Sequence, residues 1–379
     1  MIRGNYPKAG LATAAYFLVT GIVIGGWAAG IPMIKARLGE GTGVFGAALF
    51  AMAGGAVLAM PLAGALSNRF GSRPIVGIAG LLIGILYLGP VLSSTLPAFI
   101  VTGFAFGAVM GVLDVAMNTQ GLAVEQQSSR PLMSGLHGAY SVGGLIGALL
   151  GGVLVDLFGL IVQALIISLL CISTVLFARP HLLPSAVDKG LSTTHFGWPT
   201  WRTLGLGVLC FLTLMGEGAF VDWSGLFLQT RFEVDAGFAA TGFAMFSAGM
   251  AVSRFAGDAL RVRFGAVRLV RWSAVFTMAG TAAGLLSPNP VLTVVLFVLA
   301  GIGIGNIAPV LFAGGGRLEP NAPGRGIAAV TTLGYSGLLA GPPLIGIIAE
   351  FSGLGPALWL IVFAAFIIAL GARAVRALD

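Results

Sequence analysis

A few ionisable side chains stand alone inside long apolar stretches of the sequence. Asp114, His137 and Glu217 each lie within, or at the start of, a run of about 20 mostly apolar residues. A charged group held in the middle of a bilayer is costly unless it faces water or a partner, so such residues mark functional sites. Carboxylates in this setting can carry a proton or hydrogen-bond a polar solute, and a histidine nearby can exchange protons near neutral pH.

Asp114 is the first of these candidates. Helical spacing places Gly107, Gly111, Asn118 and Glu125 along nearly the same stripe as Asp114. We expect the glycines to leave room for water or solute beside the carboxylate, and Asn118 to contribute a polar group there. Asp114 is therefore predicted to line a central cavity and to carry a proton or bind solute. A polar contact between two helices is the alternative.

Glu217 is the second predicted carboxylate for proton coupling or substrate binding. It lies between two glycines past the middle of its run, and we expect these to weaken the helix, as in the broken helices of transporters. Asp222 lies nearer the outer end, beside Trp223, and fits an interfacial residue of an aromatic belt better than a binding residue. His137 either pairs with Asp114 or sits at the wet end of its helix, and the sequence leaves both open.

Aromatic and hydroxyl side chains can bind a sugar-like ring by stacking and by hydrogen bonds. The predicted cavity residues of this kind are Tyr16, Trp27, Tyr140, Trp223, Thr332 and Tyr335. Each of them can instead serve helix packing or the aromatic belts at the membrane surfaces. Tyr140 and Tyr335 gain weight because they occupy equivalent places in two similar halves of the sequence.

The composition indicates whether water or lipid surrounds the apolar runs that carry these residues. Charged residues make up 9% of the 379 positions and apolar residues 57%, and the mean hydropathy is +1.00. Soluble domains carry about 25% charged residues, so a bilayer is the surrounding that fits. The net charge of +7 comes from short basic clusters between apolar runs, which indicates membrane orientation and no nucleic-acid partner.

Apolar runs long enough to span a bilayer predict twelve transmembrane helices. They fall six and six on either side of one long polar segment, residues 179–202, which we predict to be a cytoplasmic linker. The expected fold is all-α and integral to the membrane, with two pseudo-symmetric six-helix bundles at residues 1–178 and 203–379. The predicted spans are 9–31, 43–66, 75–93, 97–119, 133–155, 159–178, 203–226, 236–257, 269–287, 291–313, 326–349 and 354–373.

The basic residues predict the orientation of these spans. If the N-terminus is inside, 17 of the 20 Lys and Arg residues, Arg254 among them, lie toward the cytoplasm. Only Lys35, Arg37 and Arg231 lie on the other side. Because cytoplasmic loops retain positive charge, we predict a multi-pass protein of the cell inner membrane with both termini cytoplasmic.

Two short matches indicate that the halves arose by duplication. Arg69-Phe70-Gly71 recurs as Arg263-Phe264-Gly265 at an offset of 194, and Tyr140-Ser141 recurs as Tyr335-Ser336 at an offset of 195. Both matches lie in the equivalent element of each half. This pattern is typical of a parallel repeat of a six-helix unit.

The loop between the second and third runs resembles a known signature. It reads Gly64-Ala-Leu-Ser-Asn68-Arg69-Phe70-Gly71-Ser72-Arg73, similar to the G-x-x-x-D-R-x-G-R-R loop of the major facilitator superfamily, with Asn68 at the usual aspartate. The resemblance implies a V-shaped pair of bundles around a central cavity. It also implies that an acidic residue ending the fourth span pairs with basic loop residues when the inside is closed, so we predict a cytoplasmic gate of Arg69, Arg73 and Glu125. The expected gating pair is Arg73 with Glu125, and solvated loop charges are the alternative.

Further motifs resemble the MosC-like branch of that superfamily, which is related to the fucose permease group. They are Leu113-Asp114-Val-Ala-Met-Asn118, His137-Gly138-Ala-Tyr140-Ser141, Glu217-Gly218 with Asp222-Trp223, Gly334-Tyr335 and Gly341-Pro342-Pro343. Members of this branch are thought to handle sugar-like or cyclitol solutes, which the resemblance implies here as a class.

The sequence contains no P-loop, no H-E-x-x-H and no serine nucleophile elbow. We therefore expect no enzyme activity, no cofactor and no metal. The predicted function is secondary active transport of a small polar, sugar-like solute, coupled to protons by symport and working by alternating access. The protein is expected to act as a monomer in the lipid bilayer. Proton antiport that exports drugs or metabolites is the alternative.

Overall fold

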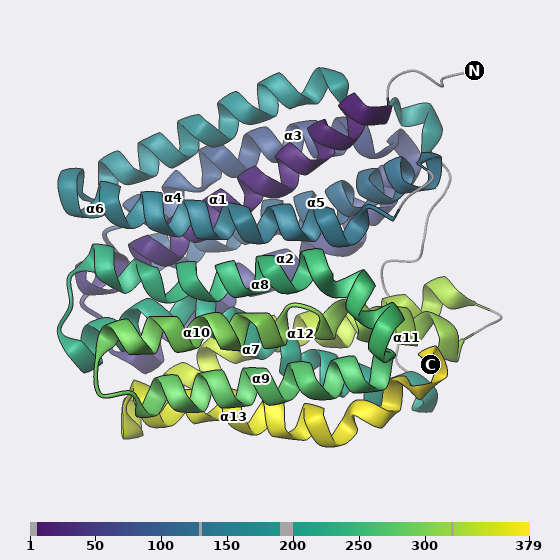
Figure 1. Cartoon of the computed structure of the whole chain (residues 1–379). Helices are drawn as coiled ribbons and strands as arrows, with labels where there is room; N and C mark the ends of the chain where they lie inside the picture. The colour runs from purple at the N-terminus through teal and green to yellow at the C-terminus, as the bar shows by residue number, and fades with distance from the viewer. Residues whose placement is uncertain (1–5, 129–130, 190–199, 320–321) are drawn as a thin grey trace.

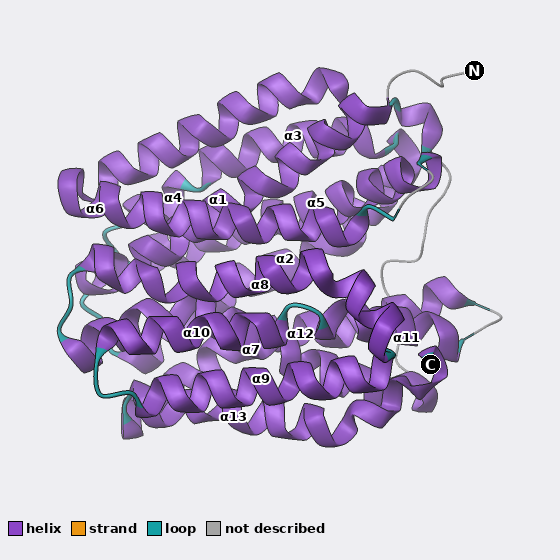
Figure 2. Cartoon of the chain, viewed as in Figure 1, coloured by secondary structure: helices purple, strands orange, loops and turns teal. Residues whose placement is uncertain are grey.

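The chain is helical throughout the part that the structure describes (Figure 1). The computed structural model describes residues 6–128, 131–189, 200–319 and 322–379, and these ranges contain no strand (Figure 2). An apolar segment in hydrocarbon must satisfy its backbone N–H and C=O groups within itself, and a helix does so. Length and hydropathy therefore decide the secondary structure.

The helices fall into two groups along the chain. The first group is α1 (Tyr6–Leu38), α2 (Thr42–Phe70), α3 (Ser72–Leu86), α4 (Leu88–Leu92), α5 (Leu96–Gln127) and α6 (Met133–Ala178), followed by the short η1 (Arg179–His181) and η2 (Ser185–Val187). The second group is α7 (Trp201–Phe232), α8 (Ala236–Phe264), α9 (Ala266–Leu286), α10 (Pro290–Ile304), α11 (Ile307–Leu318), α12 (Pro323–Ser352), α13 (Leu354–Gly371) and η3 (Ala372–Leu378).

Eleven segments among the described residues are long and apolar enough to cross a membrane, and one of these contains two spans. This segment is α6, whose Gly159 has φ 80° and ψ 169°, a backbone conformation that glycine adopts without steric cost. The helix doubles back at this point (Figure 1). The predicted all-helical membrane fold with twelve spans is therefore confirmed.

The two groups of helices occupy different parts of the molecule. Helices α1–α6 fill the upper part of Figure 1 and α7–α13 the lower part. Residues 190–199 of the predicted linker lie outside the described residues, so the predicted bundle limits and the linker's cytoplasmic placement stay predictions. Glycines with positive φ recur at the repeat offset, Gly71 with Gly265 and Gly159 with Gly353, each pair 194 residues apart.

The bundle has two opposite ends, which we call the terminal face and the far face. The terminal face is the end where α1 begins and where the chain reaches Asp379, at the right of Figure 1. The far face is the opposite end, with the turns at residues 39–41, 159, 233–235 and 353.

Glycines let the helices of the first half approach closely. A Cβ at Gly143 of α6 would collide with the carbonyl oxygen of Leu18 on α1. On α5, a Cβ at Gly107 or Gly111 would collide with the backbone of α2. The expectation that Gly107 and Gly111 leave room beside Asp114 is therefore wrong, because the backbone of a neighbouring helix occupies that space.

This packing makes a prediction about two glycines of one helix. Gly143→Ala should lower the melting temperature of the purified protein, since overpacking a tight contact costs about 1–3 kcal/mol. Gly135→Ala is the matched control, because a Cβ there meets no atom within 4 Å, and alanine favours a helix. Thermal unfolding in detergent measures both variants. Equal melting temperatures for the two would contradict the packing described.

Candidate functional site

Asp114 forms a hydrogen bond that joins the two groups of helices. The Tyr335 hydroxyl on α12 donates to Oδ2 of Asp114 on α5 at 2.7 Å. Asn118 Nδ2, one turn further along α5, donates to Oδ1 of the same carboxylate at 3.2 Å. All three side chains are half-buried. Two residues expected at the centre, Asp114 and Tyr335, thus meet across the halves.

Glu217 on α7 forms an ion pair with Arg254 on α8. Nη2 of Arg254 lies 3.1 Å from Oε1 of Glu217, and the two side chains are only 8% and 16% exposed, respectively. Arg254 also donates from Nη1 to the Ser141 hydroxyl of α6 at 2.6 Å. The guanidinium therefore links two helices of the second half to one of the first.

A break in the tenth span supplies a further acceptor for Arg254. Helix α10 ends at Ile304 and α11 begins at Ile307, and Nε of Arg254 donates to the carbonyl oxygen of Gly305 between them at 3.4 Å. Asn306 Nδ2 binds the Ser253 hydroxyl and carbonyl oxygens, both at 2.8 Å. Irregular backbone is tolerated inside a membrane where such groups satisfy it.

The structure corrects two expectations at this point. Helix α7 runs unbroken through Glu217, so the flanking glycines do not interrupt it. Arg254 is not a loop charge, because it lies inside α8, ten residues before the helix ends, and is buried. Sequence reasoning missed it as a site residue. The available signal was its place inside the predicted span 236–257, next to a span that carries an acidic residue.

The other candidate residues near Asp114 and Glu217 differ in how closely they approach these carboxylates. The carboxylates of Asp114 and Glu217 are close enough for their charges to interact. The half-buried Tyr140 is close enough to interact electrostatically with both of them. The His137 ring lies within the field of Arg254 and contacts Phe17 edge-on, with 5.3 Å between ring centroids.

No hydrogen bond or ion pair joins His137 to Asp114 among the described residues. Thr332 is half-buried, one turn before Tyr335 on α12.

We name Asp114, Asn118, Tyr140, Glu217, Arg254 and Tyr335 the central cluster.

Three predicted cavity aromatics lie outside the central cluster. Tyr16 is fully buried and packs within the first half. Its ring lies against α3, where a Cβ at Gly80 would come within 2.7 Å of it. Trp27 and Trp223 are fully buried toward the far face. The Trp27 indole donates from Nε1 to Oδ1 of Asp222 at 3.4 Å. Asp222 is 6% exposed, so the interfacial interpretation of this residue is wrong.

These tryptophans belong to an aromatic layer between the halves. Trp27 of α1 stacks on Phe99 of α5 with 6.2 Å between ring centroids. Trp223 of α7 meets Phe45 of α2 edge-on at 6.3 Å. All four rings are fully or almost fully buried. The layer lies between the central cluster and the far face.

The predicted gating pair is absent from this conformation. Arg73 Nη2 donates to the carbonyl oxygen of Pro180 at 2.9 Å, and the Arg69 guanidinium lies over the Phe70 ring at 5.1 Å. Glu125 Oε2 instead accepts the backbone N–H groups of Leu132 and Met133, at 2.6 and 2.9 Å. The start of α6 holds this carboxylate because unpaired N–H groups and the helix dipole attract it.

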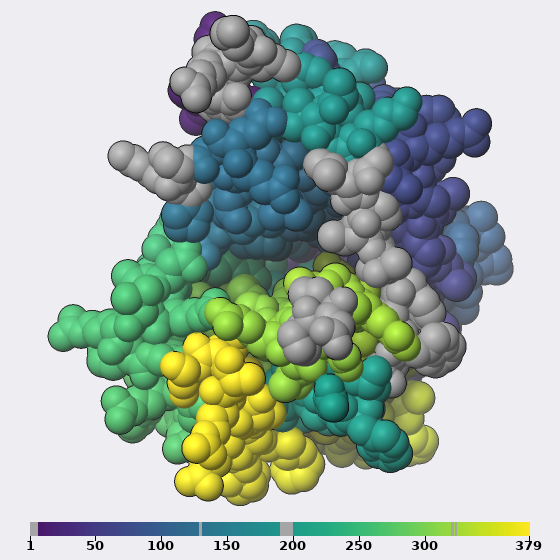
Figure 3. Space-filling view, turned by 90° about the vertical axis from the view of Figure 1, so that its right-hand side faces the viewer, coloured from purple at the N-terminus to yellow at the C-terminus, as the bar shows by residue number. Residues whose placement is uncertain are grey.

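The central cluster lies on the side of the aromatic layer that faces the terminal face. Its carboxylates are partly exposed although they lie deep within the helices, and the aromatic layer closes the other direction. Figure 3 looks onto the terminal face and shows a recess between the two halves. The structure is therefore open toward the terminal face and closed at the far face.

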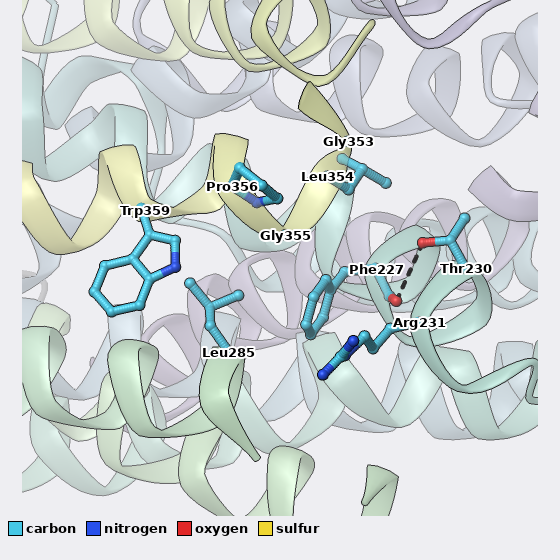
Figure 4. A pocket seen from close by; sticks show the side chains of 9 residues that line it. All are labelled: Phe227, Thr230, Arg231, Leu285, Gly353, Leu354, Gly355, Pro356 and Trp359. Atoms are coloured by element: carbon cyan, nitrogen blue, oxygen red, sulfur yellow. Dashed lines mark hydrogen bonds between the residues drawn. The ribbon is translucent and has the colours of Figure 1, made fainter. Parts of the chain in front are cut away.

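A separate cavity lies at the far face of the second half. It has a volume of about 410 Å³ and is lined by the ends of α7 and α9 and the start of α13 (Figure 4). No residue of the central cluster lines it, so it is not the predicted solute site. The described residues contain no group of three or more His, Cys, Asp and Glu side chains that could hold a metal ion.

Two groups of membrane-spanning helices, with a hydrogen bond from a tyrosine of one to a carboxylate of the other, have the architecture of a membrane transporter. The sequence pattern of the Major Facilitator Superfamily matches residues 10–314, and the chain belongs to this superfamily, as its loop motif predicted. It is a multi-pass secondary transporter that moves a small-molecule solute, and it is not an enzyme.

Two relatives match nearly the whole chain. An uncharacterized MFS-type transporter of Yersinia pestis is 33% identical over 372 residues, which cover 96% of this chain and 95% of the relative. Membrane protein MosC of Rhizobium meliloti is 33% identical over 362 residues, which cover 94% and 88% respectively.

Two solved structures share the fold. The nucleoside transporter NupG has a TM-score of 0.74 at 15% identity and covers 97% of this chain and 99% of its own. A D-xylose-proton symporter has a TM-score of 0.73 at 14% identity and covers 97% of each chain.

The ion pair of the central cluster makes a prediction about stability. Glu217→Gln and Arg254→Gln should each lower the free energy of unfolding, because each leaves the other charge buried without its partner. The double variant should recover part of the loss, with a coupling energy of about 0.5–3 kcal/mol. Chemical unfolding in detergent measures the cycle, and strictly additive losses would show that the two side chains do not interact.

Proposed function

We propose that this protein takes up a small polar, sugar-like solute together with protons, by symport. The observation that carries the proposal is the hydrogen bond from Tyr335 to Asp114, which links the two halves beside a second buried carboxylate. A solute bound at this place touches both halves. Its binding can therefore be coupled to their relative movement.

Asp114 is proposed as the proton carrier. An ionised carboxylate accepts hydrogen bonds about twice as strongly as a neutral group, so charged Asp114 holds Tyr335 and Asn118 firmly. Protonation removes that charge and weakens the link between the halves. The proton occupancy of one side chain then favours or disfavours the rocking movement that alternating access requires.

Glu217 and Arg254 are proposed to bind solute rather than to release protons. Arg254 keeps its charge at any physiological pH and pairs directly with the Glu217 carboxylate. Ser141 and Gly305 accept hydrogen bonds from the other two nitrogens of the guanidinium. A solute hydroxyl can reach the free Glu217 oxygen, and the rings of Tyr140 and Tyr335 offer faces on which an apolar side of a sugar stacks.

The terminal face is proposed to be cytoplasmic, in the cell inner membrane. Removing Arg254 from the tally of basic residues leaves 16 on this side against three on the other, which still satisfies the positive-inside rule. The structure is then open toward the cytoplasm.

The sugar-like solute class is supported by chemistry and by fold. Two carboxylates, an amide and two tyrosines match a solute with several hydroxyl groups. The two solved structures with this fold carry names that refer to a nucleoside and to D-xylose with protons.

A two-stage experiment tests this function. A thermal-shift screen of the purified protein against sugars, cyclitols and amino sugars at two pH values identifies a stabilising solute. Uptake of that solute into proteoliposomes is then measured with and without an inward proton gradient. Accumulation driven by the gradient supports symport, whereas accumulation driven only by an outward gradient would replace it with antiport.

Two substitutions at the inter-half hydrogen bond should separate proton coupling from solute binding. Asp114→Asn should reduce gradient-driven accumulation to background while exchange of labelled for unlabelled solute persists, because the amide cannot carry the proton. Tyr335→Phe should weaken both activities. Asp258→Asn, at an exposed carboxylate of α8, is the matched control and should behave as wild type. Full accumulation by Asp114→Asn would eliminate Asp114 as the proton carrier.

A further inference from the structure

Two carboxylates at the far face bind the starts of helices in the opposite half. Oδ1 of Asp156, in the first half, accepts the backbone N–H of Gly237 in the first turn of α8 at 2.9 Å. Oε2 of Glu350, in the second half, accepts the backbone N–H of Gly43 in the first turn of α2 at 2.8 Å. We call these contacts the far-face clamps. Each one ties a carboxylate to unpaired N–H groups at the positive end of a helix dipole.

The far-face clamps are related by the internal repeat. Glu350 lies 194 residues after Asp156, and Gly237 lies 194 residues after Gly43. This is the offset that also relates Gly71 to Gly265 and Gly159 to Gly353. Each half therefore provides one carboxylate and receives the other. The contact is reciprocal, as expected where two equivalent units meet about a pseudo-twofold axis.

Glycines at the two helix starts let the carboxylates approach closely. A Cβ at Gly237 would collide with the Asp156 carboxylate. At the other clamp, a Cβ on Gly41, which precedes α2, would lie 2.9 Å from Oε1 of Glu350. Both carboxylate side chains are exposed, so water can replace either contact when the halves separate.

The same chemistry occurs at the terminal face, but there it stays within each half. Asp188, after η2, accepts the N–H of Ser72 at the start of α3, at 3.2 Å to each oxygen. Asp379 accepts the N–H groups of Ala266 and Val267 at the start of α9, at 2.5 and 3.3 Å. Ser72 and Ala266 are also 194 residues apart. With Glu125 at the start of α6, five helix starts in the described part of the chain bind a carboxylate of another segment, and of these contacts only the far-face pair crosses between the halves.

We infer that Asp156 and Glu350 are positioning residues that hold the far face closed and must release Gly237 and Gly43 each time the transporter opens toward that face. Asp188 and Asp379 keep their contacts throughout, because both partners move together with one half. The inference relies on the rocking of the halves but not on proton coupling or on the identity of the solute.

A distance measurement between the halves tests this inference. Ser94 and Pro288 are exposed in far-face turns of the first and second half, and they are 194 residues apart. Spin labels on Ser94→Cys and Pro288→Cys report the far-face separation by double electron–electron resonance in lipid nanodiscs. Cys171 and Cys210 are buried, and labelling of the protein without the two new cysteines gives the background.

The labelled protein without further substitutions should show mainly the shorter label-to-label distance, that of the closed far face. Asp156→Asn and Glu350→Gln keep the side-chain shape and remove the charge, so each should raise the ratio of open to closed far face by about two- to five-fold. The double variant should combine the two effects. Glu350→Asp, which keeps the charge on a shorter side chain, should give a smaller shift than Glu350→Gln.

Asp188→Asn and Asp379→Asn are the matched controls. They remove the same type of contact within one half, so they should lower the melting temperature without changing the distance distribution. Gel filtration checks that every variant is folded. If the double variant of the far-face clamps keeps the wild-type distribution, or if the controls shift it equally, the inference is wrong. Loss of proton-coupled uptake, by contrast, has no bearing on this measurement.

Discussion

The pairing of Arg254 with Glu217 is the interaction on which the centre of this protein depends. A guanidinium cannot lose its proton inside the membrane, so it must be surrounded by acceptors wherever it is buried. Here the acceptors come from α7, α6 and the break before α11. One cation thereby fixes the mutual placement of three spans. It also sets the field in which Tyr140 and His137 lie.

Asp114 is placed differently, because its partners are neutral. The Tyr335 hydroxyl and the Asn118 amide stabilise a carboxylate, but neither compensates its charge as a guanidinium does. Of the two acidic residues, Asp114 is therefore the one whose charge can change without leaving an unpaired cation behind. The difference between the two environments is what assigns them different proposed roles.

The described conformation is asymmetric along the membrane normal. The halves meet at the far face through the Trp27, Phe45, Phe99 and Trp223 rings and through two carboxylates bound to helix starts. At the terminal face the predicted Arg73–Glu125 pair is not formed, and each residue has a partner elsewhere. One closed and one open end is the arrangement that alternating access requires at a given moment.

The sequence was sufficient for features that depend on one residue in its own apolar run. The twelve spans follow from length and hydropathy, and Asp114 and Glu217 follow from the cost of a carboxylate in hydrocarbon. Contacts between side chains of different helices depend on how the helices face one another, and the sequence predicted such contacts less well. Arg254 looked like a loop charge because it lies near the end of its run. Glu125 was predicted to pair with Arg73 when the inside is closed, and in the conformation described the start of α6 binds it.

The central claim is that Asp114 exchanges a proton inside the membrane. Infrared difference spectroscopy of the protein in lipid, recorded between alkaline and acidic pH, detects the carbonyl stretch of a protonated side-chain carboxyl group. The account predicts a band that titrates in the wild-type protein and disappears in Asp114→Asn, while Glu217→Gln retains it. A spectrum in which no titrating carboxyl band depends on Asp114 would contradict the account.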